Sequence, residues 1–252
     1  FAQEEGTSSD GLGEIIVTAQ KRAENIQDVP IAISAVGSEY LESRGISSID
    51  SLGTIAPNVK IERAPSSKTI TQIAIRGSVT INPAITWEPA VGLYLDGVYI
   101  AKAQGSIFDI ADLERVEVLR GPQGTLYGRN ALAGAINLIT KKPSGEAGGS
   151  MELTYGAYDY KKIKGILDLP QIGIFSAKLS GQYVKRDGLV DIVPNPVAGV
   201  LSALPNVVNQ TDTIDSGSFM AQVRAQLSDS VTIDYTYDYN KQKQRPPFAQ
   251  LL

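Results

Sequence analysis

The last hundred residues of the chain alternate apolar and hydrophilic side chains. In residues 175–183 and 231–240 every second side chain is apolar or aromatic, and those between are mostly polar or charged. The same period of two occurs in residues 151–155 and 219–227, and more weakly in 162–169. Because successive side chains of a strand point to opposite faces, this pattern predicts five strands, each with one apolar and one hydrophilic face.

The connections between these strands bear on the kind of sheet they form. Residues 170–173 and 228–230 provide short turns, whereas residues 187–216 form a long polar connection. A soluble sandwich also alternates, but short turns at one end and longer loops at the other are typical of outer-membrane barrels. Tyrosines gather late in the fifth strand, toward the long-loop side, where an interfacial aromatic girdle would lie. The pattern favours a barrel over a sandwich.

Residues 29–145 predict a separate α+β domain, with residues 1–28 ahead of it and the strand-rich part at 150–252. One short helix is expected from Ser38 as N-cap to Gly45, and a second from Ser48 to just before Pro57. The expected short strands are 31–36, 59–63, 69–75, 91–99, 116–120 and 135–140.

The N-terminal residues contain one β-prone segment within a polar stretch. Residues 1–13 indicate a flexible tail, and Glu14, Ile15, Ile16, Val17, Thr18 and Ala19 follow it. This segment is either an ordinary edge strand or a segment kept extended so that a partner pairs with it by strand addition.

Composition excludes several classes of function. The 252 residues carry a net charge of -4, which gives no electrostatic footprint for nucleic acid. Histidine and cysteine are both absent, so His-based catalysis, Ser-His-Asp triads and His-ligated metal sites cannot form within this chain. No stretch approaches the length of an apolar membrane-spanning helix. The stretch 115–128 lacks the Gly-Lys-Ser/Thr ending of a phosphate loop. We therefore expect no enzyme activity, no cofactor and no metal.

Several motifs resemble the plug domain of the TonB-dependent receptor family. The main one is RVEVLRGPQGTLYG at 115–128, continued by NALAGAIN at 130–137. Ile75-Arg76-Gly77 and Leu95-Asp96-Gly97-Val98 match two further plug motifs in the family's order, and residues 14–19 resemble the TonB box. One departure is Ala133, where the family more often has glycine; this matters only if that backbone needs a positive φ.

The resemblance implies a plug that fills a transmembrane β-barrel of about 22 strands in the Gram-negative outer membrane. Such a protein takes up a scarce bulky nutrient actively, powered by TonB and its inner-membrane motor complex. Its plug and N-terminus are accessible from the periplasm, and its outer surface contacts lipid and lipopolysaccharide. The TonB box, extended and unpaired, pairs with TonB as an added strand. Arg76 and Arg120 pair with barrel carboxylates and lock plug to barrel.

The resemblance also implies a small-molecule site on the outward loops of the plug. The candidate residues are Arg63, Ser66, Thr80, Asn82, Trp87, Tyr99, Lys102 and Gln104. Trp87, the single tryptophan, either stacks on a ligand or packs against the barrel wall. Siderophores, vitamins and oligosaccharides all fit the plug motifs. Two other functions are a receptor that signals across the outer membrane and a soluble β-rich binding module.

Five strands cannot close around a plug of this size, because ~8 strands leave an interior only wide enough for side chains. An open sheet in lipid would also leave two unpaired edges, where each unsatisfied backbone group is costly. We therefore expect the remainder of the barrel to be supplied by further sequence of the same chain or by a second polypeptide.

Overall fold

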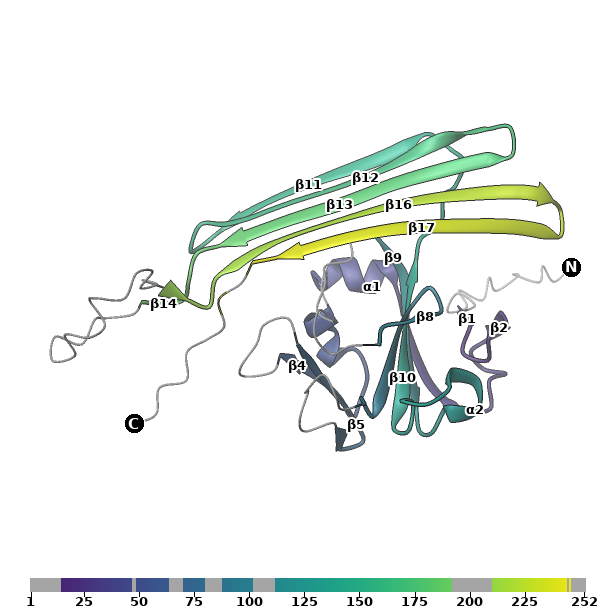
Figure 1. The fold of residues 1–252 in the computed structure, drawn as a ribbon, viewed down its shortest axis with the longest axis horizontal. Helices are drawn as coiled ribbons and strands as arrows, with labels where there is room; N and C mark the ends of the chain where they lie inside the picture. Colours follow the sequence, from purple (N-terminus) through teal and green to yellow (C-terminus); the bar gives the residue numbers. More distant parts are fainter. Residues whose placement is uncertain are drawn as a thin grey trace, which may run out of the picture.

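The computed structural model describes residues 15–46, 49–63, 70–79, 88–101, 112–191, 210–243 and 245, without the side chains of Asp50, Thr54 and Arg63. These residues form an N-terminal domain and a long C-terminal sheet that extends across one side of it (Figure 1). The expected fold class, an α+β domain followed by antiparallel strands, is confirmed.

A mixed five-stranded sheet forms the centre of the N-terminal domain. Its order is β3 (Ala32–Gly37), β9 (Leu113–Arg120), β10 (Gly134–Thr140), β7 (Val91–Leu95) and β8 (Val98–Tyr99). The pair β10–β7 is parallel and the other pairs are antiparallel. Almost every residue of β10 is buried, because both faces of the sheet are covered.

One face of this sheet packs against two short helices and a three-stranded sheet. The helices are α1 (Ser38–Ser43) and the 3-10 helix η1 (Ile49–Thr54). The small sheet contains β4 (Val59–Arg63), β5 (Thr71–Ile75) and β6 (Ser78–Val79). The resulting core includes Leu41, Ile49, Leu52, Ile75, Val116, Val118, Ile136 and Leu138.

The helices correct two sequence-based expectations. The N-cap of α1 is Gly37 rather than Ser38, and it makes no side-chain cap hydrogen bond. The helix ends as expected near Gly45, whose φ of 64° lies in the left-handed region that glycine adopts readily. The second helix forms as a 3-10 helix only, with Ser48 outside the described residues.

A turn at Asp96–Gly97 divides the expected strand 91–99 into β7 and β8. Both turn residues have positive φ, 48° at Asp96 and 81° at Gly97. The Asp96 carboxylate accepts hydrogen bonds from the Thr140 backbone N–H at 3.0 Å and the Thr140 hydroxyl at 2.6 Å. These bonds hold the reversal against the end of β10, and the Asp-Gly dipeptide, which readily adopts positive φ at both residues, explains why residues 91–99 form a hairpin rather than one strand.

A glycine-rich turn joins β9 to β10 through the single-turn helix α2 (Gly124–Tyr127). A Cβ atom at Gly134 would lie 2.2 Å from the Leu119 carbonyl oxygen, so a side chain there would collide with backbone. The neighbouring Ala133 is buried and is not among the residues with positive φ. The departure from the family pattern therefore causes no backbone strain.

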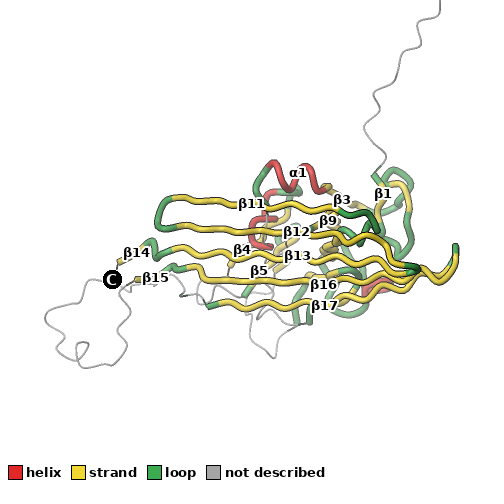
Figure 2. The backbone as a smooth tube through the Cα atoms, turned by 90° about the horizontal axis from the view of Figure 1, so that it is seen from above, coloured by secondary structure: helices red, strands yellow, loops and turns green. Residues whose placement is uncertain are grey.

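The C-terminal sheet contains the five long strands predicted from the alternating pattern. They are β11 (Gly148–Gly156), β12 (Tyr160–Ile172), β13 (Phe175–Arg186), β16 (Ile214–Ser228) and β17 (Val231–Gln242), in chain order and all antiparallel (Figure 2). Two short strands, β14 (Val190–Asp191) and β15 (Gln210–Thr211), pair within the long connection. β12 is longer than expected, because it continues through Pro170 and turns only at Gly173–Ile174.

The apolar and polar faces of this sheet are opposite to those of a soluble sandwich. Along β13 the side chains of Ser176, Lys178, Ser180 and Gln182 are buried on the face of the sheet that is turned toward the N-terminal domain. The exposed face is apolar and aromatic. It includes Met151, Leu153, Tyr155, Ile163, Leu167, Phe175, Tyr183, Phe219, Val223, Ile233, Tyr235, Tyr237 and Tyr239. No helix in the described part of the chain is long and apolar enough to cross a membrane.

Candidate functional site

The segment expected to remain free, residues 14–19, is packed onto the N-terminal domain in its described part. The strand β1 (Ile16–Val17) pairs antiparallel with β2 (Glu24–Asn25). Ile15 and Ile16 are exposed, whereas Val17 and Ala19 are fully buried. The expectation of an unpaired segment is therefore wrong for this structure, because its own chain supplies the partner strand. Glu14 lies outside the described residues.

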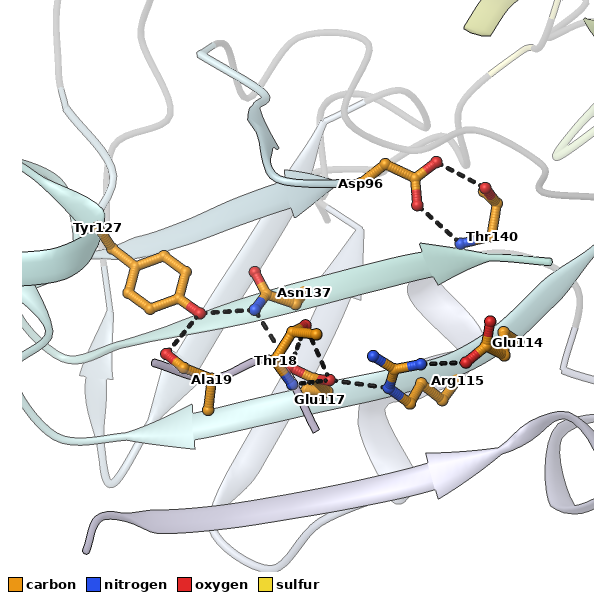
Figure 3. A network of polar contacts seen from close by, with 9 residues as sticks. All are labelled: Thr18, Ala19, Asp96, Glu114, Arg115, Glu117, Tyr127, Asn137 and Thr140. Atoms are coloured by element: carbon orange, nitrogen blue, oxygen red, sulfur yellow. Dashed lines mark hydrogen bonds and ion pairs between the residues drawn. The ribbon is translucent and has the colours of Figure 1, made fainter. Parts of the chain in front are cut away.

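Thr18 makes the central contact between this segment and the sheet. Its backbone N–H donates to Oε1 of Glu117 on β9 at 2.8 Å, and its hydroxyl donates to the same oxygen at 3.1 Å (Figure 3). The Glu117 side chain is fully buried, and it also accepts from Arg115 Nε at 2.8 Å and from Asn137 Nδ2 at 3.3 Å. Arg115 supplies the positive charge that a buried carboxylate needs.

Tyr127 of α2 makes the second contact. Its hydroxyl donates to the Ala19 carbonyl oxygen at 2.9 Å and accepts from Asn137 Nδ2 at 2.7 Å. Its own carbonyl oxygen accepts a hydrogen bond from the Tyr94 hydroxyl at 2.5 Å. Burial raises the pKa of Tyr127, which keeps the hydroxyl protonated and able to donate.

The chain turns away from the sheet directly after this contact. The Lys21 N–H donates to the Thr18 carbonyl oxygen at 2.9 Å, and Lys21 itself has a φ of 64°. The Lys21 ammonium group then lies over the ring of Tyr127, 4.5 Å from its centroid. A cavity of about 900 Å³ separates this turn from the facing residues of β17, among them Asp234 and Asp238.

Buried polar contacts attach the N-terminal domain to the C-terminal sheet. Lys178 Nζ of β13 lies 2.5 Å from a carboxylate oxygen of Asp112, which precedes β9, and 3.4 Å from Asp168 of β12. The side chains of Lys178 and Asp112 are each only 5% exposed. Gln222 Nε2 of β16 donates to the Thr140 hydroxyl at 2.7 Å. The inner polar face of the sheet thus binds the start of β9 and the end of β10.

Arg76 and Arg120 lie elsewhere. Arg76 is exposed in the turn between β5 and β6, and Arg120 ends β9, at the opposite end from Asp112. Arg120 Nη2 donates to the Ile33 carbonyl oxygen at 3.5 Å. Within the described residues neither arginine contacts a carboxylate of the C-terminal sheet. Their pairing with barrel carboxylates stays a prediction.

One candidate ligand-binding residue, Tyr99, lies among the described residues with its side chain. Ser66, Thr80, Asn82, Trp87, Lys102 and Gln104 lie outside the described residues, as does the side chain of Arg63. Tyr99 is described: it is half-buried, and its hydroxyl accepts from Asn130 Nδ2 at 2.7 Å. Its proposed role in binding stays a prediction.

Sequence reasoning identified the motif that contains Glu117, Tyr127 and Asn137 but gave these residues no individual role. The available signal was the polar pair Arg115 and Glu117, which alternates with Val116 and Val118 on a short strand. That alternation indicates a strand with a polar face. It does not reveal that the face contacts Thr18, 99 positions earlier in the chain.

Comparison with known proteins agrees with the architecture. The model of the TonB-dependent Receptor Plug Domain matches residues 25–135. The chain belongs to the TonB-dependent receptor family. The N-terminal domain is accordingly called the plug below, and the C-terminal sheet is called the wall.

The relatives are much longer than this chain. The chain is 32% identical to the pesticin receptor of Yersinia pestis over 195 residues, which is 77% of this chain and 28% of that protein. It is 29% identical to the iron-regulated outer membrane virulence protein of Vibrio cholerae over 199 residues, 74% of this chain and 29% of that protein. It therefore spans less than a third of the length of these relatives.

Solved structures show the same fold. The ferric yersiniabactin uptake receptor FyuA of Yersinia pestis superimposes with a TM-score of 0.69 and 26% identity, over 82% of this chain and 30% of that one. The ferripyoverdine receptor of Pseudomonas aeruginosa gives a TM-score of 0.70 at 19% identity, over 89% of this chain and 27% of that one. These relatives are receptors rather than enzymes, and the family is one of outer-membrane receptors.

Proposed function

We propose that the protein containing this chain takes up a scarce bulky nutrient across the Gram-negative outer membrane, driven by TonB. The plug closes the passage through the wall, and residues 14–19 are the segment that TonB binds by strand addition. Work must come from the inner membrane, because the outer membrane has no energy source of its own.

The observation that carries this proposal is the orientation of the wall sheet around the plug. Buried Lys178 and Gln222 point from the wall toward the plug and bind Asp112 and Thr140 there. The opposite face of the same strands exposes aliphatic and aromatic side chains. A sheet with its polar face buried and its apolar face exposed is favourable when the surroundings are apolar. In water, burial of the apolar face would be favoured instead.

A ferric siderophore is the first substrate class to test. The names of several relatives refer to iron or to ferric siderophores, as in ferric yersiniabactin uptake and ferrichrome transport. A vitamin B12 transporter also matches, at 26% identity over 147 residues, so vitamin B12 is the second class.

Replacing Val17 tests the coupling role of the segment. We expect Val17→Pro in the full-length receptor to abolish uptake of radiolabelled ferric siderophores while cell-surface binding continues. Proline removes a backbone donor and disfavours strand addition. Uptake and binding are measured on whole cells with a panel of hydroxamate and catecholate complexes, together with vitamin B12.

Val17→Ala is the matched control, because it keeps the backbone N–H and changes only side-chain volume. Uptake by this variant should persist, and it should disappear in cells that lack TonB. Normal uptake by Val17→Pro would eliminate the proposed role of residues 14–19.

A further inference from the structure

The docked segment is held at one hydroxyl-bearing residue. Thr18 donates two hydrogen bonds to Glu117, one from its backbone and one from its side chain. Val17 and Ala19 on either side are fully buried in the cluster that contains Tyr94, Leu119 and Tyr127. The segment therefore contributes both apolar contacts and donors to the plug.

Glu117 makes departure of the segment costly. When Thr18 leaves, the carboxylate keeps Arg115 and Asn137 but loses two donors. Hydrogen bonds to a charged acceptor are roughly twice as strong as those between neutral groups, so the loss of two of them disfavours release. The free energy of release is consequently determined in large part by a residue outside the segment itself.

Tyr127 adds a weaker contact of the same kind. Its hydroxyl is oriented by Asn137 toward the Ala19 carbonyl oxygen. This bond is between neutral groups, so its loss should matter less than loss of the Glu117 contact. The cavity between residues 18–23 and β17 provides space into which the segment can move without displacing the wall.

We infer that Glu117 is a positioning residue that sets how often residues 15–19 leave the plug and become available to a periplasmic strand-pairing partner. This inference rests on the proposed coupling role of the segment. The docking equilibrium itself needs neither partner nor nutrient. It can therefore be measured separately from uptake.

Thiol labelling measures the equilibrium directly, since this chain contains no cysteine. Val17→Cys is introduced into the full-length receptor with any cysteine elsewhere replaced, and its reaction with a charged maleimide is followed in outer-membrane vesicles. The thiol is shielded when the segment is docked. We expect Glu117→Gln to accelerate labelling roughly tenfold, the factor that corresponds to about 1.4 kcal/mol of lost docking free energy.

Three matched controls define the result. Glu62→Gln makes the same chemical change on β4, at a side chain that is 54% exposed and paired with Lys60, and should leave the Val17→Cys rate within about twofold of the parent. Ile16→Cys, on the exposed side of the segment, should label quickly in every background. Ile136→Cys, fully buried in β10 within the core on the other face of the sheet, should stay protected if only the segment is released.

Two additional variants keep the inference falsifiable if Glu117→Gln fails to accumulate. Thr18→Val removes the hydroxyl donor without changing side-chain shape, and Tyr127→Phe removes the bond to Ala19. Each should accelerate labelling of Val17→Cys by about threefold, as expected for loss of one hydrogen bond. Thr18→Ser keeps the hydroxyl and should restore the slow rate.

Two outcomes would overturn the inference. One is an unchanged Val17→Cys rate in Glu117→Gln or, where that variant is absent, in both substitute variants. The other is an equal acceleration at Ile136→Cys, which would mean that the whole plug has loosened. If labelling behaves as expected while Val17→Pro still transports, Glu117 controls the release of residues 15–19, and the coupling role of that segment is the hypothesis that fails.

Discussion

Buried charge is concentrated where the plug meets the wall. Lys178 projects from the middle of β13 and lies between Asp112 of the plug and Asp168 of the neighbouring strand. Lys141 also approaches Asp112, at 3.5 Å. The Lys178 and Asp112 side chains are each only 5% exposed, whereas Lys141 is 34% exposed and also pairs with Glu42. Removing either Lys178 or Asp112 should cost more stability than the ion pair itself contributes, because the remaining charge stays buried.

Lys178→Met tests this cluster. The substitution keeps the length of the side chain but leaves Asp112 with Lys141 alone and Asp168 without the Lys178 ammonium group, which should destabilise plug docking by about 3–5 kcal/mol. Calorimetry of the full-length receptor in detergent should show a plug transition at lower temperature. Combining it with Asp112→Asn should recover part of the loss.

Lys185→Met is the control for this experiment, because Lys185 lies on the same strand with an exposed side chain. It should shift the transition little. Equal shifts for Lys178→Met and Lys185→Met would show that the buried cluster does not attach the plug.

At the scale of elements, strands with a strict period of two were predictable, whereas contacts with partners distant in the sequence were not. Residues 231–240 appear as β17 because alternation is a local property of the chain. The turn at Asp96–Gly97 has a local signal in its Asp-Gly dipeptide, but its contact with Thr140, 44 positions away, does not. The docking of residues 15–19 depends on Glu117. Pairing partners of this kind leave no local pattern, although the motifs that contain them were recognisable.

The outward face of β17 can be tested against its inward face. Tyr237→Asp places a charge on the exposed apolar face and should lower the amount of folded receptor in the outer membrane. The expected loss of stability is about 1–2 kcal/mol and depends on the depth of the residue in the bilayer. Thr236→Asp puts the same charge on the face toward the plug, where Asp234 and Asp238 already lie. Folded receptor is quantified by its heat-dependent electrophoretic shift. Equal yields of the two variants would contradict the assignment of the faces.

At the scale of the whole molecule, one end of β9 is attached to the wall and its other end carries Arg120, one of the two residues predicted to lock the plug. Asp112, just before β9, contacts the described wall sheet, whereas Arg120 at the other end of β9 faces away from those contacts. Since Arg120 Nε is buried without a hydrogen-bond partner among the described residues, a carboxylate from another part of the wall would complete its surroundings.

Combined replacement of Arg76 and Arg120 by alanine should therefore loosen the plug in the full-length receptor. We expect increased entry of a large antibiotic that an intact outer membrane excludes, with the folded barrel present at normal levels. Arg129→Ala provides the comparison, because that side chain is 82% exposed and its ion pair with Glu88 lies at the surface. Unchanged antibiotic entry in the double variant would argue against a lock at these two positions.

The strand order also has a kinetic consequence. In the wall, each strand pairs with the next long strand of the chain, so its hairpins bring together residues that are mostly close in sequence. In the plug, β3 pairs with β9, and Ser34 meets Val118 only after 83 intervening residues have been synthesised. Because closing long loops slows folding, wall hairpins should form faster than the central sheet of the plug. Assembly therefore has a preferred order, in which the plug acquires its final pairing while wall hairpins already exist.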